Sequence, residues 1–187
     1  MHTYLEFEVS LLDIDPRIWR RFQLGAHDTF GDLHVAIQDS FDWDRDHMWL
    51  FRTSGRDRRT LAGPDASILD YESDDIPDAW SVKLTQHFRR VSMTCRYTYD
   101  FGDNWVHAVK LRRRVATEER LRRRLVDGSR AAPPEDCGGA YGYWRLVERL
   151  ETGNDPWGLK PDEQPGWIDS WRPDQFDLAA AKSAFDE

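Results

Sequence analysis

The chain has 187 residues, of which 40% are apolar, and it contains nine Trp, nine Phe and six Tyr. This composition supplies the apolar material for one compact domain over residues 1–187 and excludes collagen-like, coiled-coil, low-complexity and generally disordered chains. Acidic residues outnumber basic ones by 34 to 26, so the formal net charge of −8 repels polyanions on average.

The chain carries no sequence signal for a membrane or for secretion. Its longest apolar runs have only four residues, such as 48–51, against the roughly 20 that span a bilayer. The N-terminus is acidic and alternating, without the basic start and apolar stretch of a signal peptide. The two cysteines, Cys95 and Cys137, are expected to be free thiols. We therefore expect a cytoplasmic protein with no membrane partner.

Two strands joined by a turn are predicted first along the chain. Apolar and polar side chains alternate over 5–11 and again over 18–24, which is the period-two pattern of strands with one buried face. Residues 13–16 read Asp-Ile-Asp-Pro and are typical of a turn. The two strands are expected to form a hairpin.

Arg20 shares the parity of the apolar side chains in the second of these strands. Its side chain is therefore predicted to point inward, where an unpaired guanidinium would be very costly, and to need an acidic or carbonyl partner. We expect Arg20 to be buried and paired with a carboxylate of Asp103, Glu135 or Asp136, because those acids lie in turns or loops that are free to point at it.

A helix is predicted to begin after Thr29, whose side chain suits an N-cap, with Asp32 near the positive end of the helix dipole. Apolar residues then recur at helical spacing through 33–41. A short strand is expected over 48–52. The polar stretch 54–78, with two Gly and two Pro, is expected to be irregular.

Two further alternating strands, 91–101 and 105–111, both bury their odd-numbered residues. Partners of equal parity require a loop with an odd number of residues, and the simplest choice is 102–104. This register places Phe101 opposite Trp105.

The same register predicts which side chains of the hairpin point inward. Tyr99 lies opposite His107, so Phe101, Trp105 and His107 are expected to face the core. Asp100 is expected to face outward, away from His107.

The remaining part of the chain is predicted to be mostly helical. Helices are expected over 117–125, where the sequence is rich in Arg, over 143–151, and over 178–185 with Asp177 as N-cap. The stretch 133–139 is expected to be irregular, and the Trp- and Pro-rich segment 152–187 is expected to pack on the domain. Because strands and helices do not alternate, we predict an α+β fold with a mainly antiparallel sheet and three or more helices packed on it.

Three stretches of the chain match the pattern of a known family. They are Ile18-Trp19-Arg20-Arg21 with Leu33-His34, Ile37-Gln38, Trp43, His47 and Phe51; Tyr99-Asp100-Phe101-Gly102-Asp103-Asn104-Trp105-Val106-His107; and Pro133 to Gly139 with Gly142-Tyr143. In these stretches the chain resembles the Ri-plasmid open-reading-frame-three family, sometimes labelled TnpR-like because related proteins travel with mobile elements. The resemblance implies an α+β fold and no established activity. The chain has Trp49, Leu125 and Ala132 where relatives often have a further His or Cys.

The motifs supply a set of side chains that could line one functional cleft. These are Arg20, His47, Asp103, His107, Glu135, Asp136 and Cys137. A metal site could also use Asp100, but the spacing of Cys-x-x-Cys or His-Glu-x-x-His is absent, and the predicted register separates Asp100 from His107. We therefore expect no metal and no cofactor.

Three of the motif positions have simple structural interpretations. His107 is expected to be a core histidine held by a Tyr hydroxyl or a carboxylate, with general acid or base catalysis as the alternative. The acids beside Cys137 should raise its pKa, which disfavours a nucleophilic role. The pair Gly138-Gly139 lacks the spacing and Lys of a phosphate-binding loop, so it is expected to permit a tight turn.

A basic stretch offers an alternative function. Residues 110–130 contain nine basic and three acidic residues, whereas 151–187 contain nine acidic and three basic ones, and the two segments are expected to pair with each other. Within 110–124, Lys110, Arg112 and Arg114 are predicted to share the solvent face of one strand, with Arg96 across from Lys110. This strip could bind nucleic acid, although no known nucleic-acid-binding motif accompanies it.

These observations favour a non-enzymatic binding or accessory module of a mobile-element-associated family, with a protein or small molecule as partner. Two alternatives remain open. One is a hydrolase-like enzyme that uses carboxylates and His107, and the other is a nucleic-acid-binding domain that uses the basic stretch 110–124.

Overall fold

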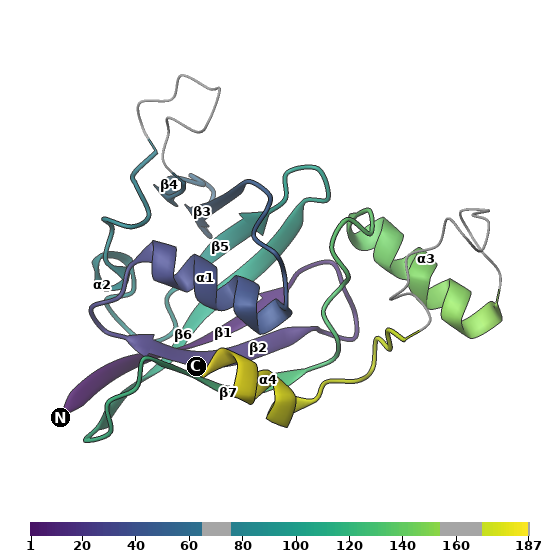
Figure 1. Cartoon of the computed structure of the whole chain (residues 1–187). Coiled ribbons are helices and arrows are strands. Elements are labelled where there is room, and N and C mark those ends of the chain that lie inside the picture. Colours follow the sequence, from purple (N-terminus) through teal and green to yellow (C-terminus); the bar gives the residue numbers. More distant parts are fainter. Residues whose placement is uncertain (65–75, 154–169, 187) are drawn as a thin grey trace.

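The computed structural model describes residues 1–64, 76–153 and 170–186, and its α+β fold is built on one antiparallel sheet (Figure 1). Seven strands of these residues lie in the order β4-β3-β5-β6-β1-β2-β7. They are β1 (His2–Leu11), β2 (Trp19–Gly25), β3 (Trp49–Thr53), β4 (Thr60–Ala62), β5 (Thr94–Tyr99), β6 (Trp105–Thr117) and β7 (Arg123–Ser129). The predicted fold class is confirmed.

The helices of the described residues are α1 (Phe30–Phe41), α2 (Leu84–His87), α3 (Gly139–Thr152) and α4 (Leu178–Phe185). Helices α1 and α4 contact each other and lie on one face of the sheet, while α3 stands beside the sheet (Figure 1). Aromatic side chains fill the space between these two helices and the strands. The ring of Phe30 in α1 lies 5.0 Å from that of Phe51 in β3, and Phe22 in β2 lies 5.5 Å from Phe185 in α4. No helix in the described part of the chain is both long and apolar enough to cross a membrane.

Several local predictions are confirmed. Strands β1 and β2 form the expected hairpin, and α1 begins after Thr29 with a full capping box. The Thr29 hydroxyl accepts from the Asp32 amide at 3.2 Å, while the Asp32 carboxylate accepts from the Thr29 amide at 2.8 Å. Asp177 caps α4 by accepting from the amides of the second and third helical residues.

The register predicted for the central hairpin is wrong by two residues, although its parity is correct. Tyr99 lies opposite Trp105, so the loop covers five residues, 100–104. Asp100 leaves the strand early because it takes a left-handed conformation, with φ 53°, and its carboxylate accepts from the Gly102 amide at 2.8 Å. As a result Phe101 is 54% exposed rather than buried, and Asp100 is almost completely buried rather than facing outward.

Two predictions of local structure are also wrong because long-range strand pairing decides them. The expected helix over 117–125 is absent, and Arg123–Ser129 forms β7, whose buried Leu125 lies opposite Phe22 of β2. Within the stretch expected to be irregular, Thr60–Ala62 forms β4 on β3. Residues 65–75 of that stretch lie outside the described residues.

The C-terminal segment is described from residue 170 to residue 186. The Trp171 indole donates to the carbonyl of Ala132 at 2.9 Å, and α4 packs on β7. At the end of α4, Arg123 donates to the carbonyl of Phe185 at 2.6 Å. Residues 154–169, which hold most of the Trp- and Pro-rich stretch, lie outside the described residues.

Candidate functional site

Three loops that carry the sequence motifs meet beside the sheet. They are the connection 42–48 between α1 and β3, the hairpin loop 100–104, and the stretch 133–138 before α3. Each pair of neighbours is joined by hydrogen bonds. The Trp43 indole donates to the carbonyl of Pro133 at 2.9 Å, and the Gly138 amide donates to the carboxylate of Asp103 at 3.0 Å.

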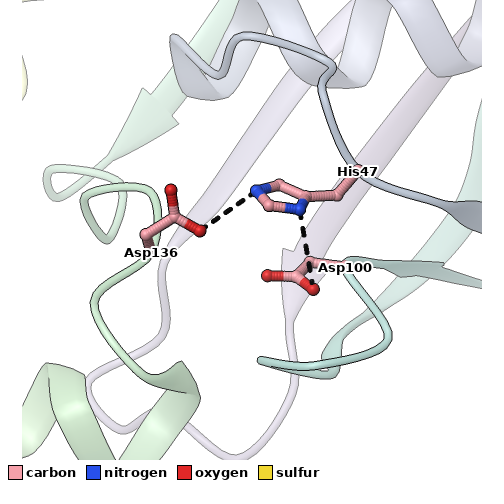
Figure 2. Close-up of side chains that lie close together, drawn as sticks. All are labelled: His47, Asp100 and Asp136. Carbon is pink, nitrogen blue, oxygen red and sulfur yellow. Dashed lines mark ion pairs between the residues drawn. The ribbon is translucent and has the colours of Figure 1, made fainter.

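His47 occupies the centre of these loops and lies between two carboxylates (Figure 2). Its Nε2 is 3.1 Å from Oδ1 of Asp136, and its Nδ1 is 3.9 Å from Oδ1 of Asp100. The imidazole is partly open to solvent, with 31% of its side chain exposed, and Asp136 is far more exposed than Asp100. One nitrogen of His47 and one oxygen of each carboxylate all lie within 4.8 Å of one another.

A second pair of side chains, Tyr99 and Glu135, links the loops next to His47. The Tyr99 hydroxyl donates to Oε1 of Glu135 at 2.5 Å, and the other oxygen of that carboxylate accepts from the Asp44 amide at 2.6 Å. Burial of Tyr99 and the neighbouring charge of Glu135 both raise the pKa of the phenol, so it stays protonated and donates. The ring of Tyr99 also stacks on Trp43 at 5.2 Å and meets the edge of the His47 ring at 5.7 Å.

Close backbone contacts at the start of α3 fix the loop that carries Asp136. Gly139 has a φ of 66°, and a Cβ there would lie 2.4 Å from the carbonyl oxygen of Asp103. A Cβ on Gly142 would lie only 1.6 Å from the carbonyl oxygen of Cys137. Glycine is therefore required at both positions for this loop and α3 to approach so closely.

Cys137 lies in the same loop but has no nucleophilic character. Burial, with a further contribution from the charge of Asp103, raises the pKa of its thiol to about 12. Cys137 and Cys95 are both free.

Arg20 lies outside this cleft, and the prediction that it pairs with a carboxylate is wrong. The side chain is buried as expected, with 2% exposure. Its guanidinium donates to the carbonyls of Ser40 at 2.7 Å, Trp19 at 2.9 Å and Ser129 at 3.1 Å, and it lies over the ring of Phe176 at 3.9 Å. Backbone carbonyls from three elements thus satisfy the donors without an acid, and burial lowers the pKa of Arg20 to about 9.

His107 also lies outside the cleft, since its side chain is fully buried in the core. Its Nδ1 donates to the carbonyl of Trp105 at 3.1 Å, so the expected Tyr hydroxyl or carboxylate partner is not the one found. Burial lowers the pKa of His107 to about 3, and the ring therefore stays neutral. A buried, neutral histidine cannot reach a substrate as general acid or base.

The basic residues proposed for nucleic acid do not form one strip. A bulge lies in the pairing of β6 with β1, so Lys110 lies opposite Glu8, whereas Arg114 lies opposite the buried Leu5. Arg112 lies 3.8 Å from Glu8, and Arg114 donates to backbone carbonyls near α2.

One further expectation about the basic stretch needs correction. Arg96 lies opposite Ala108 on β6, not opposite Lys110, because the hairpin register differs by two. Within the described residues, Arg123 and Arg124 form ion pairs with Asp39 and Glu119. Most acids of 151–187 lie outside the described residues, so the expected pairing of the two segments stays a prediction.

The structure therefore joins four of the seven predicted cleft residues, namely His47, Asp103, Glu135 and Asp136, with Cys137 beside them, and removes Arg20 and His107. Sequence reasoning considered Asp100 for a metal site but set it aside because the predicted register turned it outward, and it missed Tyr99 as the support of Glu135. The signal for Asp100 was present in the Asp-Phe-Gly sequence, since an Asp two residues before Gly commonly closes a turn with its own carboxylate.

Fold and site together define a class: an α+β protein in which helices cover one face of an antiparallel sheet and three loops beside that sheet form an acidic cleft around a histidine. The chain belongs to the family described as plasmid pRiA4b ORF-3-like protein, whose model matches residues 3–180.

Two relatives illustrate how far this similarity extends. The chain is 29% identical over 184 residues to the uncharacterized protein y4hQ of Sinorhizobium fredii, which covers 96% of this chain and 86% of that protein. It is similar in structure to the protein of unknown function MM3350 from Methanosarcina mazei Go1, with a TM-score of 0.78 and 30% identity over 96% of this chain and 98% of the other.

Proposed function

We propose that this chain is a binding module that holds a divalent cation at His47, Asp100 and Asp136. The observation that carries the proposal is the convergence of one imidazole nitrogen and two carboxylate oxygens, within 4.8 Å of one another, from three separate loops (Figure 2). Imidazole with carboxylates is a ligand set that Zn²⁺ and Mn²⁺ accept, and three protein ligands leave coordination positions open. This proposal replaces the expectation that no metal binds. That expectation depended on the missing ligand spacing and, in part, on a register that turned Asp100 outward.

The charges around the cleft support a cationic ligand. Glu135 and Asp103 lie in the same loops, and a neighbouring cavity of about 570 Å³ is lined by Asp42 and Asp44 as well. Several carboxylates in one cleft raise the local concentration of cations. A bound cation would relieve their mutual repulsion.

Binding is favoured over catalysis because the described cleft offers no activated nucleophile. The Cys137 thiol is held protonated by its raised pKa, and His107 is fully buried. The role that best fits is an accessory one, in which the cation fixes the three loops for a protein or small-molecule partner. Association with mobile elements and a cytoplasmic location stay predictions.

The experiment is a calorimetric titration of chelator-treated protein with Zn²⁺ and Mn²⁺. We expect one cation per chain, and Asp100→Asn and His47→Gln should each weaken binding at least about tenfold because each removes a direct ligand. The matched control is Asp46→Asn, an exposed acid in the same loop as His47, which should bind as the parent does. Equal affinity for the parent and Asp100→Asn would show that the cation does not bind here.

The contact of 3.1 Å between Asp136 and His47 favours a second candidate, a hydrolase in which His47 replaces His107 as general base. In that case hydrolysis of chromogenic ester or phosphate substrates should persist in chelator and disappear in His47→Gln. Activity that follows the added metal instead would assign the cleft to metal-assisted hydrolysis.

A further inference from the structure

Two arginines lie directly opposite each other on the sheet. Arg52 of β3 is the antiparallel partner of Arg96 of β5. Like charges at such paired positions destabilise a sheet. None of the ion pairs within the described residues includes either of them, so no ion pair in this part of the chain offsets their repulsion.

The two arginines line a groove with a volume of about 380 Å³, near the lower end of the range for small-molecule sites. A third arginine, Arg58, also lines it, and no acidic residue of the described part of the chain does. The nearest acid along the chain, Asp57, accepts from the Thr53 hydroxyl at 2.9 Å. The groove is therefore strongly cationic in a protein whose net charge is −8.

An exposed aromatic ring completes the groove. Phe101 is 54% exposed at the tip of the β5–β6 hairpin, and Asn104 and Thr98 add polar groups beside it. Arginine binds phosphate through paired donors, and aromatic side chains stack on planar rings, so these neighbours suit the two halves of one ligand.

The groove lies on the opposite face of the sheet from α1. Tyr97 points to α1, where its hydroxyl contacts His34 at 2.7 Å, and its neighbours Arg96 and Thr98 alternate to the other face. The loop 100–104 thus serves two sites. It presents Asp100 to the acidic cleft and Phe101 to the groove.

We propose that this groove binds a ligand of mononucleotide size, with its phosphate between Arg52 and Arg96 and its planar ring on Phe101. The phosphate offsets the repulsion of the two guanidinium groups. This site uses none of the side chains of the proposed cation site, so the two proposals are tested independently.

The test is calorimetric titration with AMP, inorganic phosphate and adenosine in the presence of a chelator, which excludes metal-bridged binding. AMP should bind one per chain, phosphate should bind about tenfold or more weakly because it lacks the ring, and adenosine should not bind measurably. Arg52→Gln and Arg96→Gln should each weaken the affinity for AMP at least about tenfold. Phe101→Ala should weaken the affinity for AMP but leave the affinity for inorganic phosphate unchanged.

The control Arg120→Gln removes the same charge from an exposed position beyond the far end of β6, and it should bind AMP as the parent does. Folding gives a second readout, since Arg52→Gln removes a repulsion and should raise the melting temperature by about 1–3 °C without ligand. An arginine kept only for structure would lower the melting temperature when replaced.

Three outcomes would overturn the proposal. One is AMP affinity unchanged in Arg52→Gln. Another is a single-stranded oligonucleotide that binds far more tightly than AMP with a steep salt dependence, which would assign the groove to a nucleic-acid strand. The third is AMP binding that appears only after the five acidic residues of 65–75 are replaced by their amides, which would show that the chain's own carboxylates hold these arginines.

Discussion

The helix-covered face of the sheet and the loops beside it use the same residue types in opposite ways. On the covered face, Arg20 and His107 are buried, and their donors are used by backbone carbonyls. In the loops, His47 is partly open and lies between carboxylates. Buried polar groups whose donors are used by backbone carbonyls stabilise the fold, whereas accessible groups that face like or opposite charges remain available to a ligand. The following predictions test this division, beginning with the largest effect.

Arg20→Ala should lower the free energy of unfolding by about 3–5 kcal/mol, because it leaves three carbonyls without a donor and a cavity under Phe176. Urea denaturation measures this change. The control is Arg112→Ala. The Arg112 side chain is 43% exposed and lies 3.8 Å from Glu8, a weak surface ion pair, so its loss should lower the free energy of unfolding by less than about 1 kcal/mol. Equal losses for the two variants would remove the distinction between the covered face and the surface.

Gly142→Ala should lower the free energy of unfolding by about 1–3 kcal/mol. The added Cβ would overlap the carbonyl oxygen of Cys137 and push the loop away from α3. The same variant should weaken cation binding, because that loop carries Asp136. Tyr141→Ala, at the 74% exposed neighbouring position, should change neither quantity. A parent-like cation affinity in Gly142→Ala would mean that the loop need not be held against α3.

The buried histidines should make the fold sensitive to acid. Burial lowers the pKa of both His34 and His107 to about 3, against 6.5 for the unfolded chain. The unfolded state therefore binds more protons between pH 6.5 and pH 3, so stability is full above pH 6.5 and falls as the pH falls through this window.

Each buried histidine contributes up to about 1.4 kcal/mol per pH unit to this loss. Unfolding free energies measured from pH 7.5 to pH 4.5 should show the slope. His107→Leu should reduce the slope of the unfolding free energy against pH by the contribution of one proton. His27→Gln, at an exposed position, should leave this slope unchanged. An unchanged slope in His107→Leu would contradict the assignment of a neutral core histidine.

Phe101→Ala should change stability by less than about 0.5 kcal/mol, because the ring is 54% exposed. The register predicted from the sequence would bury this ring and make the same substitution cost about 3–5 kcal/mol. Thermal denaturation of this one variant distinguishes the two registers.

Much of the fold follows from local signals in the sequence. The capping box at Thr29, the cap at Asp177 and the alternation in β1, β2, β5 and β6 each act within a few residues, so they predict their elements correctly. Strand β7 was not predicted because its Leu125 gains its burial from Phe22, about a hundred residues earlier in the chain. Local propensity carries no information about such a partner.

The residues of the candidate site also differ in how far local sequence signals predict them. His47, Asp103, Glu135 and Asp136 were predicted from the sequence motifs, and the loops that carry these motifs meet in space. Asp100 was set aside because parity arguments cannot detect a register shift of two residues. Such a shift keeps the side chains of the paired strands on their faces and moves Asp100 and Phe101 from the strand into the loop. The carbonyl partners of Arg20 could not be predicted, since they depend on how three backbone segments meet.

The position of α4 also affects how the protein behaves at high concentration. Strand β7 ends the sheet, and the carboxylate of Asp186 at the end of α4 accepts from the Leu125 amide at 2.6 Å. An uncovered outermost strand can pair with the same strand of another molecule. Cleavage of the chain before Leu178 would remove that cover, and the shortened protein would be prone to associate edge to edge into sheet-extended aggregates.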